Sequence, residues 1–217
     1  MDFFDSFERI RIINLAHRTD RRREMENELA GVGLLGDPKV KFFSAHSFVD
    51  KGLFYSAGAV GAFSSHLAIL SEALEANQSV LILEDDCDFT RHVRNFALPA
   101  RWDIFYGGYE ATSNPDDPTV SDIVGAHCMG FSAATLPALV SFLIASFEGP
   151  DPAPIDGEYV RFRRANPSVV AVFATPPLGV QRPSRTDIGP QMAYEHFLGL
   201  KEAIAWARKV KRCLTRL

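Results

Sequence analysis

A short apolar run that leads directly into three acidic residues is the feature of this sequence that most restricts its fold. The run covers residues 79–83, and Glu84, Asp85 and Asp86 follow it. Continuous apolar runs of this length are typical of strands that are covered on both faces, as in parallel sheets. In such sheets, ligands bind beyond the carboxyl ends of the strands. The segment therefore predicts a buried strand whose acidic end borders a ligand site.

Other apolar runs alternate with helical patterns along the chain. Further strands are expected at residues 10–15, 40–44, 103–106 and 169–174, and helices at residues 21–30, 58–76 and 136–147. Asn77 should end the second helix, and Thr19 or Asp20 should cap the first. Residues 114–121 and 149–154 are polar or proline-rich and are expected to be loops. The alternation predicts an α/β fold with a mainly parallel central sheet flanked by helices.

Length and composition restrict the class of protein further. A chain of 217 residues that is 47% hydrophobic suits one domain. The net charge of -4 gives no basic excess, so nucleic acid is not an expected partner. Cys87, Cys128 and Cys213 form no CxxC pair, which favours a reducing compartment over a zinc ribbon. The N-terminus lacks the basic and apolar regions of a signal peptide, so we expect a cytoplasmic protein.

The C-terminal segment, residues 191–217, differs from residues 1–190. Its apolar residues recur at helical spacing, and six of its residues are Lys or Arg at positions 201, 208, 209, 211, 212 and 216. This pattern predicts a basic amphipathic helix. The helix could dock on the domain with its basic end in solvent, or it could lie on the anionic inner surface of a membrane. The sequence leaves both possibilities open.

The three carboxylates at the end of the predicted strand repel one another, and a bound divalent cation would relieve that repulsion. Carboxylate oxygens suit Mg²⁺ or Mn²⁺. In an extended chain, Glu84 and Asp86 face one side and Asp85 the other, so Glu84 with Asp86, or Asp86 with Asp88, could bind the metal. The alternative is a solvated acidic turn that binds nothing.

A second motif overlaps this acidic segment. Residues 86–90 read DCDFT, which matches the DxDxT pattern of phosphatases that use the first Asp as a nucleophile. In that interpretation Asp86 would carry the phosphoryl group. Glu84 and Asp85 intervene between the strand and the motif, and the motif lies unusually far from the N-terminus. Both features count against a phosphatase.

Several segments in order resemble glycosyltransferase family 25, the lipopolysaccharide and collagen β-galactosyltransferase group. Residues 13–22 are similar to the family's INLxxRxDRR start, residues 58–66 to GxxGCxxSH, and residues 80–86 to LILEDD. Residues 102–108 resemble a WDhhhhG strand, residues 154–156 a PxD segment, and residues 181–188 a Q…SDI segment. Ala62 and Thr186 depart from the family's Cys and Ser. The matches cover most of the chain.

The resemblance implies a GT-A-like domain over residues 1–190 that uses Mn²⁺ or Mg²⁺ and a UDP-sugar. It also implies inverting transfer of a hexose, galactose by preference, to a glycan or lipid-linked glycan in bacterial lipopolysaccharide or other surface polysaccharide. The metal would lie on Asp86 and Glu84. The donor-binding candidates are Asn14, Arg18, Asp20, Arg21, Ser65, His66, Glu84, Asp85 and Gln181.

Inversion needs a base that receives the proton of the acceptor hydroxyl. Asp156 is the first candidate, because its proline-framed loop should lie near the carboxyl edge of the sheet, and Glu110 is the second. His127, expected just before a helix, could complete the metal shell. His66 could instead be a half-buried structural residue, and Arg22 and Arg23 an exposed helix face. A member that binds a sugar nucleotide without catalysis is the remaining alternative.

Overall fold

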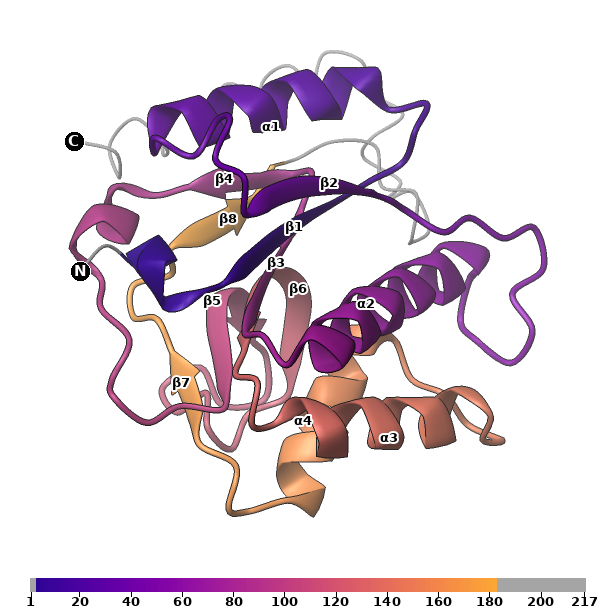
Figure 1. The fold of residues 1–217 in the computed structure, drawn as a ribbon. Coiled ribbons are helices and arrows are strands. Elements are labelled where there is room, and N and C mark those ends of the chain that lie inside the picture. The colour runs from indigo at the N-terminus through magenta and orange to yellow at the C-terminus, as the bar shows by residue number, and fades with distance from the viewer. Residues whose placement is uncertain (1–2, 183–217) are drawn as a thin grey trace, which may run out of the picture.

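The computed structural model describes residues 3–182 (Figure 1). The predicted C-terminal helix and the 183–188 part of the Q…SDI segment lie outside the described residues. The main sheet has six strands in the order β2-β1-β3-β6-β5-β7. These strands are β1 (Arg9–Asn14), β2 (Val40–Ser44), β3 (Val80–Glu84), β5 (Ile104–Ala111), β6 (Ile123–Phe131) and β7 (Ala171–Phe173). A second sheet pairs β4 (Cys87–Phe89) with β8 (Gly179–Gln181).

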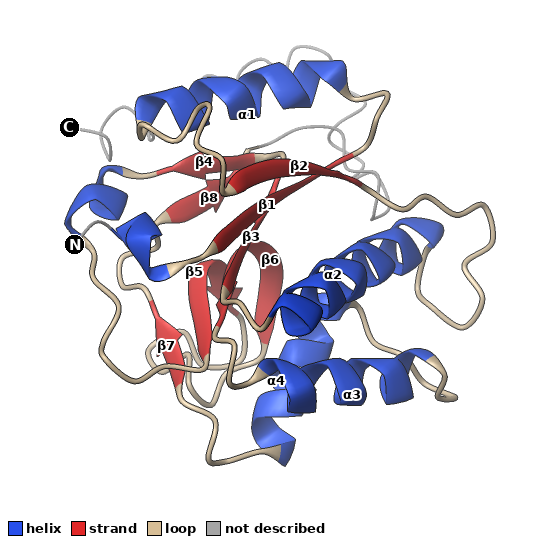
Figure 2. Cartoon of the chain, viewed as in Figure 1, coloured by secondary structure: helices blue, strands red, loops and turns tan. Residues whose placement is uncertain are grey.

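Helices cover both faces of the main sheet (Figure 2). One face carries α1 (Thr19–Gly31) with the short 3₁₀ helices η1 (Phe3–Ser6) and η2 (Arg91–Asn95), and the other carries α2 (Ala57–Ala76), α3 (Leu136–Phe147) and α4 (Ile155–Ala165). Each face has its own apolar core. The predicted α/β class with flanking helices is therefore confirmed.

Strand β3 shows why the apolar run before the acidic residues had to be buried. Val80 and Ile82 pack in the core under α2, whereas Leu81 and Leu83 pack in the core under α1. All four side chains are fully buried. Because successive side chains of a strand point to opposite faces, a strand covered on both sides must be apolar throughout.

The sheet is mixed, although most of its pairings are parallel as predicted. β1 pairs in parallel with β2 and β3, and β5 pairs in parallel with β7. The exception is β6, which runs antiparallel to both β3 and β5. The sequence did not predict β6, because Gly125, His127 and Gly130 interrupt its apolar pattern.

Helix α2 has the boundaries that its sequence indicated. The side chain of Ser56 caps its first turn by accepting a hydrogen bond from Ala59 N at 3.1 Å, and Asn77 ends it in a left-handed conformation. Within the described residues α2 is the one helix whose length and composition match a membrane span, yet half of it is buried inside the domain, as expected for a core helix. For α1, the expected cap was wrong: Thr19 and Asp20 lie inside the helix, after Arg18.

Candidate active site

A pocket of about 200 Å³ lies where β1 and β3 end, against the N-terminal half of α2. Its apolar wall contains Ile13 at the end of β1 and Leu15 just beyond it, and its acidic wall contains Glu84, Asp85 and Asp86. The segment after β2 and one face of α2 close the other sides, with Ala45, His46, Ser47, Phe48, Ala57, Gly58, Gly61, Ala62, Ser65 and His66. Arg21 and Gln181 also line it. The predicted ligand edge of the sheet is thus a pocket with three carboxylates on one wall.

Arg21 holds two of these carboxylates. Its Nη1 donates to Asp85 Oδ1 at 2.9 Å and lies 3.2 Å from Asp86 Oδ2. Asn14 Nδ2 donates to the other oxygen of Asp85 at 2.7 Å. All four side chains are buried, which makes these charge-assisted contacts stronger than the same contacts in water. Arg21 on α1 and Asn14 on β1 therefore fix the side chain of Asp85 together. Asp85 follows β3 and lines the pocket.

The two carboxylate oxygens of Asp86 differ in their hydrogen bonding. Gln181 Nε2 donates to its Oδ2 at 3.4 Å, but within residues 3–182 its buried Oδ1 has no hydrogen-bond partner. Burial raises the pKa of Asp86 to about 7, and the charge of Glu84 adds to the effect. Burial likewise raises the pKa of Glu84, although His127 and Arg21 oppose it. The pocket is therefore unfavourable for its own anionic carboxylates.

These residues fit a divalent cation that is shared with a ligand. In the described part of the chain no three His, Cys, Asp or Glu side chains converge to form a complete metal site. Mg²⁺ and Mn²⁺ sites that also bind a diphosphate need only one or two protein carboxylates. The unpartnered oxygen of Asp86 beside Glu84 provides such a pair.

His66 is buried completely, so the expectation of a half-buried side chain was wrong. Its Nδ1 hydrogen-bonds the hydroxyl of Tyr159 at 2.9 Å, and its Nε2 lies 3.9 Å from Glu84 Oε1. Burial lowers the pKa of His66 to about 4, so the ring is neutral at neutral pH. His66 thus links the acidic wall of the pocket to α4 without adding charge.

The segment after β2 is the part of the site that the sequence did not indicate. His46 N donates to Ser65 Oγ at 2.9 Å, and Ser65 Oγ donates to Gly61 O at 2.7 Å. A Cβ atom on Gly61 would lie 2.6 Å from the carbonyl oxygen of His46. Glycine in the middle of a helix marks such a close approach of backbone, and this was the available signal. Ser65 and Gly61 together hold His46, Ser47 and Phe48 against the pocket.

We expect Gly61→Ala to destabilise the protein by about 1–3 kcal/mol, because the new methyl group must displace the backbone of His46. Urea denaturation would measure the loss. Gly31→Ala is the matched control: it lies in the last turn of α1, where a Cβ would meet nothing within 4 Å. A loss for Gly61→Ala no larger than that for Gly31→Ala would show that the segment after β2 is not held by this contact.

Several predicted site residues lie elsewhere. Arg18 and Asp20 form an ion pair with each other at 2.9 Å, and neither lines the pocket. Glu110 is exposed near the end of β5. His127 lies within β6 and not before a helix, and its Nε2 is 3.3 Å from the carbonyl oxygen of Gly179. Of the donor-binding candidates, the pocket is lined by Arg21, Ser65, His66, Glu84, Asp85 and Gln181.

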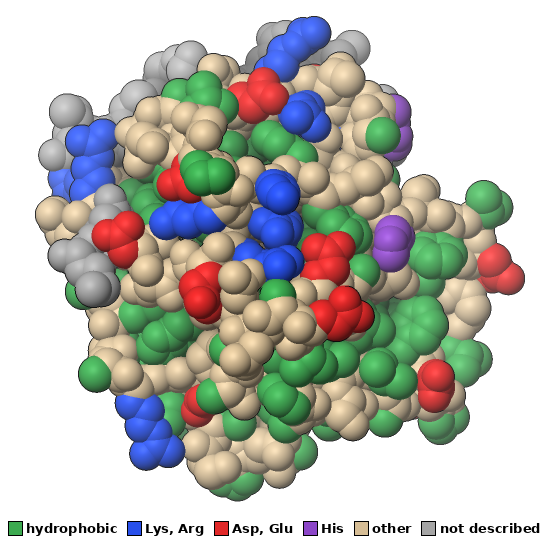
Figure 3. All heavy atoms as spheres, in the orientation of Figure 1, with side chains coloured by type: hydrophobic (Ala, Val, Ile, Leu, Met, Phe, Trp, Pro, Cys, Tyr) green, Lys and Arg blue, Asp and Glu red, His purple; other side chains and the backbone are tan. Residues whose placement is uncertain are grey.

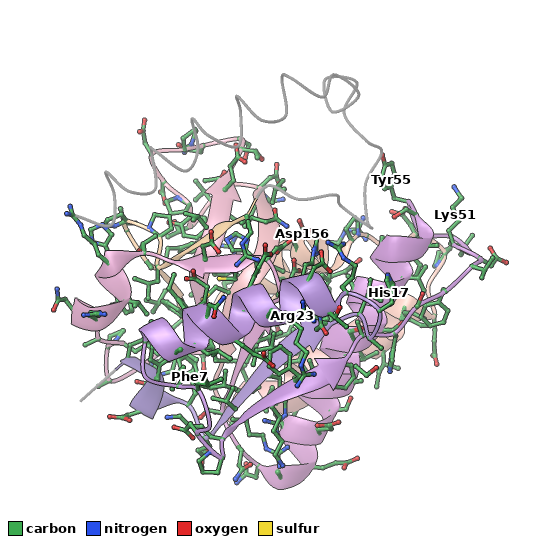
Figure 4. All side chains as sticks on the ribbon, turned by 90° about the horizontal axis from the view of Figure 1, so that it is seen from above. Phe7, His17, Arg23, Lys51, Tyr55 and Asp156 are labelled. Carbon is green, nitrogen blue, oxygen red and sulfur yellow. The ribbon has the colours of Figure 1, made fainter. Side chains whose placement is uncertain are left out.

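Asp156 is not in a loop, contrary to expectation, but in the first turn of α4. Pro154 starts that helix instead of breaking the chain into a loop. Both carboxylate oxygens of Asp156 accept backbone hydrogen bonds at 2.9 Å, from Gly125 N and Gly157 N. Figure 4 places Asp156 near the middle of the molecule, and it is not part of the pocket lining.

In the structure, the two aspartates of the DxDxT motif lie in different surroundings. Asp86 lines the pocket, but Asp88 does not, because its side chain accepts a hydrogen bond from Arg182 Nε at 2.9 Å and is buried there. Arg182 also bonds Glu24 on α1, so this cluster ties the small sheet to the helix. The two aspartates of the motif therefore do not share one site.

The fold belongs to a class, the GT-A-like α/β domains. A crystal structure of a glycosyltransferase involved in the glycosylation of the major capsid of PBCV-1 has the same fold, with a TM-score of 0.54. The match covers 81% of this chain and 94% of that one, at 11% sequence identity, so it concerns the fold alone. The predicted GT-A-like fold is thereby confirmed.

Sequence comparison finds similarity to one family. A glycosyltransferase 25 family member from Aedes aegypti is 30% identical over 158 residues, and one from Drosophila melanogaster is 27% identical over 162 residues. These alignments cover 61% and 63% of this chain. The chain is therefore similar to members of glycosyltransferase family 25. It spans 26% of the length of each of these relatives. No protein-family model matches it.

Proposed function

We propose that this protein is a glycosyltransferase that moves a hexose from a UDP-sugar to a hydroxyl group of a glycan or lipid-linked glycan. The observation that carries the proposal is the acidic wall of the pocket, where Asp86 lies beside Glu84 and has a buried oxygen without a hydrogen-bond partner among residues 3–182. The similarity to glycosyltransferase 25 family members supports the reaction class. Galactose as the sugar, and lipopolysaccharide or surface polysaccharide synthesis at the cytoplasmic membrane face, are proposed from the motif resemblance.

In this proposal Asp86 and Glu84 would hold Mn²⁺ or Mg²⁺ when the donor is bound. The metal would supply a positive charge that stabilises the leaving UDP. Arg21 forms ion pairs with both Asp85 and Asp86. These ion pairs orient the turn after β3 in the absence of a ligand. Gln181 and the hydroxyl of Ser65 supply uncharged polar groups to the same pocket. Ile13 and Leu15 supply the apolar wall that a nucleotide base requires.

For an inverting reaction, the proposed general base is Asp156 or Glu110. Asp156 would act only if the acceptor approached from α4, because both of its oxygens accept backbone N–H groups there. Glu110 would act only if the acceptor extended along the exposed end of β5. Glu84 lines the pocket itself. Among residues 3–182, its carboxylate has no hydrogen-bond or ion-pair partner closer than His66 Nε2, at 3.9 Å.

The test is to incubate the protein with a panel of UDP-sugars, Mn²⁺ and a panel of oligosaccharides, and to follow UDP release. We expect release from one hexose donor, stimulated by an acceptor and abolished by a chelator. UDP-sugar binding without any release would identify a non-catalytic binding protein. Release of phosphate from p-nitrophenyl phosphate, with no UDP release, would identify a phosphatase and contradict the proposal.

A further inference from the structure

The loop between β2 and α2, residues 46–55, exposes an unusual number of large apolar side chains beside the pocket. Phe48 is 43% exposed, Val49 103%, Leu53 69% and Tyr55 61%. The loop projects past the N-terminal end of α2 (Figure 1), and this side of the surface shows exposed hydrophobic side chains (Figure 3). Single exposed apolar residues are ordinary, but four within eight positions next to a pocket indicate a binding surface.

This loop is held in place rather than hanging free. Phe54 is buried, and its ring lies 5.4 Å from that of Phe63 and 5.5 Å from that of Phe147. Gly52 N donates to Asp50 Oδ1 at 2.9 Å, and Phe54 N donates to the carbonyl oxygen of Lys51 at the same distance. Because Phe54 points inward, Leu53 and Tyr55 on either side of it are directed outward. The exposure of these side chains is therefore built into the loop.

The exposed surface is continuous with the pocket. Phe48 belongs to both, because it lines the pocket and carries exposed ring surface, and its neighbours His46 and Ser47 line the pocket too. Figure 4 shows Lys51 and Tyr55 at the outer edge of the molecule, where the loop reaches solvent. A ligand that extends out of the pocket on this side would meet the loop next.

We propose that residues 46–55 bind the saccharide acceptor, with the rings of Phe48 and Tyr55 against the C–H faces of its sugar units. This inference rests on the proposed transferase function, since it assigns the acceptor to the open side of the donor pocket. Aromatic rings present a negative face that attracts polarised C–H groups. The same loop carries His46, Asp50 and Lys51, whose side chains are hydrogen-bonding groups for sugar hydroxyls.

Charge favours a saccharide over a lipid surface. The loop carries one Asp and one Lys, so their charges cancel. Binding to an anionic membrane surface uses clusters of several Lys or Arg residues. A neutral acceptor that presents both apolar and hydroxyl surface matches a loop that carries both apolar and polar side chains.

The test compares Tyr55→Ala and Leu53→Ala with Leu35→Ala, using full-length protein. Leu35 is 59% exposed and lies beyond α1, away from the pocket lining, so it is a matched control. Binding to an array of free oligosaccharides is measured without donor. We expect Tyr55→Ala to weaken binding of the recognised glycan about tenfold, with a smaller loss for Leu53→Ala and none for Leu35→Ala. In turnover assays, the acceptor KM should rise for Tyr55→Ala while the donor KM stays within about twofold.

Three results would overturn the inference: no glycan binding by the wild-type protein, equal binding by all variants, or a Tyr55-dependent interaction with neutral phosphatidylcholine vesicles and not with glycans. Binding of UDP with Mn²⁺ is measured separately on the same samples. Absence of UDP binding in the presence of Mn²⁺ would contradict the proposed function. The glycan array contains no donor, so its result tests the role of the loop alone.

Discussion

Asp86→Asn should reduce metal-dependent UDP release by about 100-fold or more, the scale of losing one preorganised group that stabilises charge in the transition state. The side chain keeps its shape, so its hydrogen bond with Gln181 can be preserved through a change of amide orientation. What it loses is the negative charge of a carboxylate that lines the pocket. Initial rates at saturating Mn²⁺ measure the effect, with Glu26→Gln as the control, a change at a partly exposed residue of α1 that does not line the pocket.

The same variant should be more stable than the wild-type protein when metal is absent. Because the folded-state pKa of Asp86 is raised from 3.8 to about 7, its contribution to stability is present below pH 3.8 and is lost as the pH rises through about 7. Asn does not ionise, so it does not reduce the stability of the folded protein as the pH rises. The stability difference should therefore be largest above pH 7 and shrink toward pH 4. An activity loss accompanied by lower stability at pH 8 would indicate misfolding instead of a lost ligand group.

Arg21→Met should cost about 3–5 kcal/mol of unfolding free energy, the range for breaking a buried ion pair from one side. Without the guanidinium group, Asp85 and Asp86 remain buried without a positive charge beside them. Urea denaturation measures the cost. Arg22→Met is the control: Arg22 is half-exposed, its ion pair with Glu26 on the helix surface contributes roughly 0.5 kcal/mol or less, and its guanidinium, 4.1 Å from the centre of the Phe42 ring, adds about 0.5–1 kcal/mol.

The double variant Arg21→Met/Asp85→Asn distinguishes charge from packing. If the loss comes from the uncompensated carboxylate, removal of that charge should restore a large part of the stability. Added Mn²⁺ should also stabilise Arg21→Met more than the wild-type protein. Equal costs for Arg21→Met and Arg22→Met would contradict the role of Arg21 as the cation that holds the acidic turn.

The sequence predicted those parts of the fold whose local pattern agrees with the final packing. β3 was readable because both of its faces are buried, and α2 because its apolar stripe, its cap and Asn77 all indicate the same boundaries. β6 was missed since glycines and a histidine replace the apolar residues that mark a strand. α4 was missed because Pro154 was interpreted as part of a loop, although proline is well suited to the start of a helix.

The candidate site was predicted in part for a similar reason. Arg21, Glu84, Asp85 and Asp86 converge because they lie at the ends of neighbouring strands and the helix that follows β1. Their position follows from topology. His46 and Phe48 reach the pocket through a long-range contact, the packing of a loop on Gly61 and Ser65, which no local pattern encodes. Asp156 was misplaced because its role had been inferred from a loop that does not form.

Calorimetric titration of UDP into the wild-type protein, with and without Mn²⁺, tests the central claim most directly, because it needs neither the sugar nor the acceptor. If Asp86 and Glu84 share a divalent cation with the diphosphate in this pocket, Mn²⁺ should increase UDP affinity at least tenfold, and Asp86→Asn should remove that increase. UDP affinity that is the same with Mn²⁺ and with a chelator, or an Mn²⁺ effect that survives Asp86→Asn, would contradict the account.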